Sequence, residues 1–155
     1  MNAAHPREAP EEHTAMYTPP NLRAANAYKS VGVQSSVDGA DPHQLVTLMF
    51  DGLEQAVLTA RGAVQRGDVA AKGAQIMRAV RFLEEGLKGG LDAERGGELA
   101  ERLRSLYDYC IERLTLANLR NDGELLAEVA SLIAPVAQGW KEIGRQPRNT
   151  ASQPA

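Results

Sequence analysis

The sequence has few of the residues that support cross-links, catalysis or membrane insertion. Of its 155 residues, one is cysteine and three are histidine. The single cysteine, Cys110, excludes an intrachain disulfide, and its place on an apolar helical face favours a small buried hydrophobe in a reducing compartment. Every apolar run is shorter than the roughly 18 residues that a membrane-spanning helix needs. The first residues lack the basic and apolar regions of a secretory signal. These features predict a cytoplasmic protein.

The charges and histidines also argue against nucleic-acid binding and catalysis. The net charge is -3 and the basic residues are spread among acids, so no basic patch predicts contact with nucleic acid or an anionic membrane. His5 and His13 fall in a proline-rich segment and His43 falls in a helix first turn, which leaves no rigid catalytic arrangement. The pairs Gly89-Gly90 and Gly96-Gly97 lack the strand that precedes a phosphate-binding loop. We therefore expect no enzyme, metal or cofactor.

Composition divides the chain into one folded domain and two tails. Residues 1–20 hold four of the eight prolines and almost no large apolar side chain, which is typical of a disordered tail. Residues 146–155 are polar and contain proline, and we expect a second disordered tail there. Residues 21–145 supply the apolar content that a single core requires. The sequence predicts one helical domain over 21–145.

Apolar residues recur at spacings of three and four, which predicts four amphipathic helices. The first spans Pro42 to Arg66, and the second follows the tight Gly67-Asp68 junction and continues to Leu87. The third carries an apolar face from Leu99 to Ala117, and the fourth ends at Gly144. Short connections make sequential helices antiparallel. We expect an all-α, antiparallel four-helix bundle with an additional short N-terminal helix or cap segment.

Polar residues and breakers predict how the helices begin and end. Asp41 precedes Pro42 and is suited to accept from the free amides of the first helix. Asn121, with Glu124 three residues later, predicts a capping box for the fourth helix. Pro135 lies inside that helix and predicts a kink, because proline removes one backbone hydrogen bond and crowds the preceding turn.

Large apolar side chains also lie outside the stripes that a small bundle needs. They are Val46, Phe50, Phe82, Tyr107, Tyr109, Ile111, Leu116 and Leu119. One interpretation is that a central helix buries more than one face. The other is that grooves between helices accept apolar side chains from a partner helix. Both can hold, because Tyr28 in the segment 22–28 is placed to fold over a groove and to leave when a partner binds.

An ordered set of short motifs resembles the flagellar export chaperones for flagellin, the FliS family. The resemblance runs from about Ala27 to Ile143. It is carried by Ala27-Tyr28, Phe50-Asp51-Gly52, Leu91-Asp92, Gly96-Gly97-Glu98-Leu99-Ala100, Leu106-Tyr107-Asp108-Tyr109, Arg113-Leu114, Ala117-Asn118, Asn121-Asp122 and Trp140. Each motif is weak alone, but their order and spacing are specific. Phe50, where the family often has tyrosine, keeps the aromatic ring.

The resemblance implies a cytosolic chaperone that binds the disordered C-terminal segment of flagellin, prevents premature polymerisation and aids delivery to the flagellar type III export gate. The surplus apolar side chains, taken together with positions that match the family motifs, give the expected groove residues: Phe50, Tyr107, Tyr109, Leu114, Ala117 and Asn118. Asn118 is expected to bond the partner's backbone, and Tyr28 to act as a movable cap. The alternative is a structural or adaptor bundle that uses the same surface for homodimerisation or for docking on the export machinery.

Overall fold

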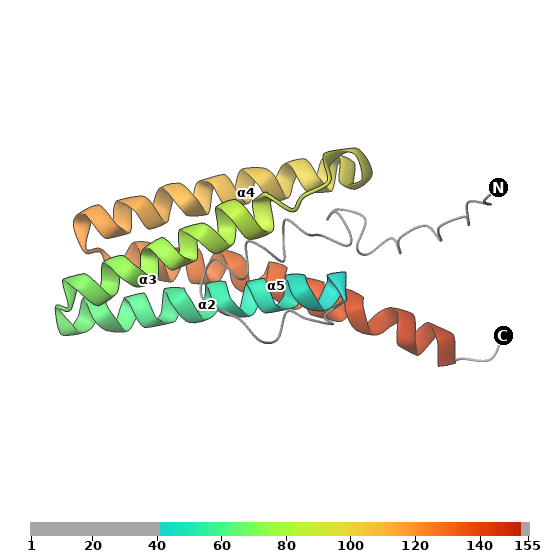
Figure 1. Cartoon of the computed structure of the whole chain (residues 1–155), viewed down its shortest axis with the longest axis horizontal. Coiled ribbons are helices and arrows are strands. Elements are labelled where there is room, and N and C mark those ends of the chain that lie inside the picture. Colours follow the sequence, from blue (N-terminus) through green and yellow to red (C-terminus); the bar gives the residue numbers. More distant parts are fainter. Residues whose placement is uncertain (1–40, 153–155) are drawn as a thin grey trace, which may run out of the picture.

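The computed structural model describes residues 41–152, with side chains as far as Arg145. Its helices are α2 (Pro42–Arg66), α3 (Val69–Arg81), the π-helix η2 (Phe82–Lys88), α4 (Ala93–Arg120) and α5 (Gly123–Ser152). Successive helices run in opposite directions, with η2 continuing α3 (Figure 1). α2 packs on α3 and α5, and α4 packs on α5, η2 and α3. This arrangement confirms the predicted all-α, antiparallel four-helix bundle. Tyr28 and the expected N-terminal cap segment lie outside the described residues.

The boundaries of α2 follow the predicted cap residues. Asp41 Oδ1 accepts from the backbone N–H of Gln44 at 2.7 Å, and Pro42 occupies the first helical position. Gly67 ends the helix in the left-handed region at φ 71°, where a residue without a Cβ is favoured. Asp68 then caps α3 by accepting from the N–H of Ala71 at 3.0 Å. The tight turn between α2 and α3 is confirmed.

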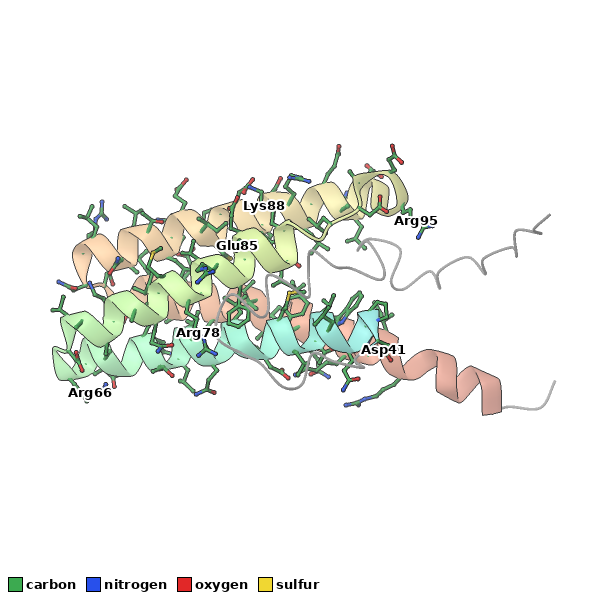
Figure 2. All side chains as sticks on the ribbon, in the orientation of Figure 1. Asp41, Arg66, Arg78, Glu85, Lys88 and Arg95 are labelled. Carbon is green, nitrogen blue, oxygen red and sulfur yellow. The ribbon has the colours of Figure 1, made fainter. Side chains whose placement is uncertain are left out.

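The second helix differs from the single α-helix that the sequence predicts. From Phe82 it widens into η2, whose Gly89 N–H donates to Glu84 O, five residues earlier, at 3.0 Å. Four residues of η2 are buried in the core, namely Phe82, Leu83, Gly86 and Leu87. Outside the core, Lys88 bridges η2 to α4 through Asp108 Oδ1 at 2.7 Å (Figure 2).

Glycines set how closely α2 approaches η2. The ring of Phe82 occupies the space that a Cβ on Gly52 would take, and Met49 Sδ does the same at Gly86. These two contacts interlock the helices from both sides. They give Gly52 of the Phe50-Asp51-Gly52 motif a packing role.

Helix α4 begins and ends with unusual backbone conformations. Asp92 caps its first turn by accepting from the N–H of Arg95 at 3.2 Å, and Gly97 then breaks the helical path at φ 53°. At the other end, Asn121 has φ 53° and is the C-cap of α4. Asp122 Oδ1, not Asn121, accepts from the N–H of Glu124 at 2.9 Å. The predicted capping role of Asn121 is therefore wrong, because the chain needs that residue to end α4.

The predicted end of the fourth helix at Gly144 is also wrong. Helix α5 continues to Ser152 and passes through Pro135 without interruption. Gly144 serves packing instead, because the ring of His43 fills the space that a Cβ there would occupy. The kink at Pro135 stays a prediction.

Half of the side chains assigned to a surplus surface are in fact buried in the core. Val46, Phe50, Phe82 and Tyr107 are each 3% exposed or less. Tyr109, Ile111 and Leu116 are half-buried, and Leu119 is 78% exposed. The interpretation that central helices bury more than one face therefore holds for the first four residues.

Candidate partner-binding groove

An apolar pocket of about 240 Å³ lies where α4 begins and α5 nears the end of the bundle. Residues from three helices line it: Phe50 of α2, Leu99, Leu103 and Tyr107 of α4, and Pro135, Val136, Gly139, Trp140 and Ile143 of α5. The pocket is partly open to solvent, and its surface is almost entirely apolar. A cavity of about 150 Å³ is enough for a benzene molecule. This pocket therefore has room for one or two large apolar side chains.

The depth of the pocket comes from buried rings and a missing side chain. Phe50 and Tyr107 are buried beneath it, whereas Leu99 at its rim is 52% exposed. Gly139 faces open space, because no described atom lies within 4 Å of the position a Cβ would take. A larger residue at this point of α5 would fill part of the pocket. Glycine here leaves a hollow that residues 41–145 do not fill.

Trp140 is a fixed wall of the pocket. Its indole Nε1–H donates to His43 O at 3.1 Å, and its ring stacks on the His43 imidazole with centroids 4.4 Å apart. His43 Nε2 lies 2.7 Å from Trp140 O, so the two residues are joined in both directions. These contacts tie the start of α2 to α5. Trp140 is also the only tryptophan of the chain, which makes it a specific spectroscopic reporter of the pocket.

The contact between α4 and α5 continues from the pocket toward a polar network. Helical spacing places the half-buried Leu106 and Leu132 next along the two helices, after Leu103 and Val136. We call the pocket and this continuation the α4–α5 groove.

The polar network closes that groove. Tyr109 Oη donates to Glu128 Oε2 at 2.5 Å, and Arg113 Nε lies 3.4 Å from Glu128 Oε1. The Arg113 guanidinium sits over the Tyr109 ring, 4.9 Å from its centroid.

Burial raises the pKa of the neighbouring Cys110 thiol to about 11, with a further contribution from the Glu128 charge. At neutral pH Cys110 is therefore a thiol and a poor nucleophile.

The structure brings together two of the predicted groove residues and separates the others. Phe50 and Tyr107 line the pocket, and Tyr109 lies farther along the same groove. Leu114 and Ala117 are fully buried in the core. Asn118 lies on the side of α4 that faces α3, and its backbone carbonyl accepts from Lys72 Nζ at 2.7 Å. Tyr28, the remaining expected residue, is outside the described residues.

Sequence reasoning missed most of the pocket lining. Leu99 and Leu103 were assigned to a buried helical face, and the five residues from α5 were not assigned to a site. Trp140 is the residue that could have indicated the pocket, because a lone tryptophan followed by Ile143 extends the apolar face near the end of α5. Gly139 gave no indication of the pocket in the sequence, because its role depends on the open space beside it in the folded bundle.

The described part of the chain lacks two further features. Residues 41–145 contain no group of three His, Cys, Asp or Glu side chains arranged to hold a metal ion. None of the described helices is long and apolar enough to cross a membrane.

The bundle and the apolar pocket between its helices define a class of protein, the small all-α helical bundles. The family model described as "Flagellar protein FliS" matches residues 24–147. The chain belongs to the FliS family, whose members are flagellar secretion chaperones.

Three relatives illustrate the closeness of the match. The flagellar secretion chaperone FliS of Salmonella typhimurium is 46% identical over 128 residues, covering 83% of this chain and 93% of that protein. FliSB of Pseudomonas aeruginosa is 41% identical over 122 residues, covering 79% and 96%. FliS of Escherichia coli is 39% identical over 120 residues, covering 77% and 88%. The similarity thus extends over nearly the full length of each relative.

Proposed function

We propose that this protein is a cytosolic, non-catalytic export chaperone that holds the disordered C-terminal segment of flagellin in the α4–α5 groove. Held there, the segment is kept from premature polymerisation until delivery to the flagellar type III export gate. The observation that carries this proposal is the open apolar pocket between α4 and α5, in a chain of the flagellar secretion chaperone family.

The physical properties of the groove suit an amphipathic segment that folds as it binds. Each Å² of apolar surface buried contributes about 25 cal/mol, whereas ordering the segment costs roughly 2 to 5 kcal/mol or more. A rigid binding surface loses less conformational entropy when the segment binds, and the Trp140 wall of the pocket is held rigidly by His43. Binding of this kind is specific yet reversible, as a chaperone that must release its client requires.

The expected groove residues have different roles in this proposal. Phe50 and Tyr107 form the pocket floor, and Tyr109 contacts the client farther along the groove. Leu114 and Ala117 support α4 from within the core. Tyr28 is proposed to cover the groove before a client arrives. Asn118 is proposed to bond the backbone of a client segment that reaches the α3 side of α4.

Leu99→Glu tests the groove with a matched control. Leu99 lines the pocket and is 52% exposed, whereas Leu58 of α2 is 59% exposed and does not line it. A carboxylate at the pocket rim loses apolar burial and is desolvated by the client. We expect Leu99→Glu to weaken binding of a flagellin C-terminal peptide by about tenfold or more, measured by titration calorimetry. Leu58→Glu should bind as the wild type does.

Sedimentation of the wild type with and without the peptide separates the chaperone from an adaptor. A one-to-one complex with a gain in helical circular dichroism supports the proposal. Homodimerisation through the groove, with no uptake of peptide, contradicts it. So does equal peptide affinity for Leu99→Glu and Leu58→Glu, because the site would then lie elsewhere.

A further inference from the structure

Pro135 removes one backbone hydrogen bond from the wall of the α4–α5 groove. It lies within α5 and lines the pocket. In an α-helix each carbonyl accepts from the N–H four residues later, so the carbonyl of Ser131 is aimed at Pro135, which has no N–H to donate. Ser131 O therefore lacks the hydrogen bond that position 135 supplies in an ordinary helix.

The side chains near this carbonyl are directed elsewhere. The Ser131 hydroxyl donates to Glu128 O at 2.8 Å, in the preceding turn. Gln138, one turn later, donates to Glu142 Oε1 at 3.3 Å, and Ala134 has no donor in its side chain. These contacts leave Ser131 O available to solvent or to another molecule.

The carbonyl lies at the edge of the groove. Ser131 and Pro135 are both exposed, whereas the adjacent Leu132 and Val136 are half-buried against the core. Because the carbonyl is directed along the helix axis toward Pro135, it lies within about one helical turn, roughly 5 Å, of the pocket lining. It marks the border between the apolar lining and the solvent side of α5.

A client segment that covers Pro135 also removes water from this carbonyl. A carbonyl that is buried without a donor costs about as much free energy as a lost hydrogen bond. An apolar side chain placed over Ser131 O would impose that cost, whereas a donor side chain would replace the lost water. The groove therefore discriminates between segments by what lies beside their apolar face.

We propose that Ser131 O, left free by Pro135, is a specificity point of the α4–α5 groove that accepts a hydrogen bond from a donor side chain of the client. The donor is an amide, hydroxyl, ammonium or guanidinium group next to the apolar side chain that packs on Pro135. This inference rests on the proposed function, since the client is the flagellin segment.

Pro135→Val tests the role of the missing N–H. Valine restores the N–H that bonds Ser131 O and keeps a branched apolar side chain in the pocket lining. We expect binding of the flagellin C-terminal peptide to weaken roughly threefold to tenfold by titration calorimetry, because the client donor loses its acceptor. The thermal midpoint without peptide should rise, because the helix gains a hydrogen bond.

Two further variants act as controls for side-chain size. Pro135→Ala also restores the N–H but leaves less apolar surface, so a similar loss in both variants assigns the effect to the backbone. Ala134→Val places valine at an exposed neighbouring position that does not line the pocket and changes no backbone bond. We expect Ala134→Val to bind the peptide as the wild type does.

A scan of the peptide identifies the donor. Each Asn, Gln, Ser, Thr, Lys and Arg of the peptide is replaced by alanine in turn, and every peptide is titrated into the wild type and into Pro135→Val. We expect one replacement to weaken binding to the wild type roughly threefold to tenfold and binding to Pro135→Val less than about twofold. The other replacements should affect both proteins equally.

Two results would overturn the inference while leaving the proposed function intact. One is a Pro135→Val protein that binds the peptide as tightly as the wild type, while Leu99→Glu still loses binding. The other is a scan in which every replacement affects the two proteins equally. Peptide that fails to bind the wild type at all contradicts both the proposed function and the inference.

Discussion

The bundle has two contrasting contacts between helices, which we call seams: α2 with η2, and α4 with α5. They differ in what faces their glycines. Between α2 and η2, the ring of Phe82 fills the space beside Gly52, and Met49 fills the space beside Gly86. Between α4 and α5, Gly139 meets no described atom and opens onto the pocket. The first seam is closed by its own side chains, and the second has apolar surface that the described residues leave uncovered. In the function that we propose, stability and binding thus depend on different pairs of helices.

The largest effect should follow from adding one methyl group to the closed seam. Gly52→Ala places a Cβ inside the space of the Phe82 ring, which has no flexible end to move away. Overpacking of this kind costs about 1 to 3 kcal/mol, and the higher helix propensity of alanine offsets roughly 1 kcal/mol of that cost. We expect a net loss of up to about 2 kcal/mol in the free energy of unfolding, measured in urea.

A second variant separates overpacking from other causes. Gly52→Ala combined with Phe82→Leu should lose less stability than the sum of the two single variants, because the shorter side chain leaves room for the methyl group. A Gly52→Ala protein as stable as the wild type would show that the seam is not tightly closed.

The same substitution in the open seam should have the opposite sign. Gly139→Ala meets no clash, so helix propensity should raise the free energy of unfolding by about 0.5 to 1 kcal/mol. Its methyl group also enters the pocket, and we expect a slightly lower affinity for the flagellin peptide. Urea unfolding and calorimetry check the two effects. A destabilised Gly139→Ala protein would place an unseen contact at the pocket and remove the contrast between the seams.

The last prediction concerns pH and Cys110, which is buried in the core beside the open seam. Burial raises the pKa of Cys110 from its ordinary value near 9 to about 11, so the folded state favours the neutral thiol. The stability from this preference is complete below pH 9 and is lost as pH rises from 9 through 11. Stability should therefore fall more steeply over that range in the wild type than in Cys110→Ala, followed by thermal midpoints. Parallel curves would contradict the burial of the thiol.

Periodicity and caps were enough to predict the bundle, because helix faces and polar caps are local in sequence. The bounds of α2, the turn at Gly67-Asp68 and the antiparallel order are all confirmed. The error at Asn121 is local, because that residue ends α4, whereas the error at Gly144 lies where a residue serves a distant contact. Gly144 signals a helix end locally, yet it accommodates the ring of His43 from the start of α2. The π-helix that begins at Phe82 also packs on α2, a contact between residues far apart in the sequence.

The groove was predicted as a kind of site but only partly as a set of residues. Phe50 and Tyr107 were assigned to it because their rings lie outside the main helical stripes, and they do line the pocket. Leu99 and Leu103 fit a core stripe, so spacing alone could not show that the stripe leaves the core where α4 begins. Gly139 makes the hollow through what it lacks, and no pattern in the sequence reports that.

The most direct test of the account is to follow the pocket itself during binding. With 5-fluorotryptophan at position 140, the single fluorine resonance reports on the wall of the α4–α5 groove. We expect this resonance to shift on addition of the flagellin C-terminal peptide and to saturate at one equivalent. A resonance that stays unchanged, while sedimentation shows the complex has formed, would place the client elsewhere and contradict the central claim.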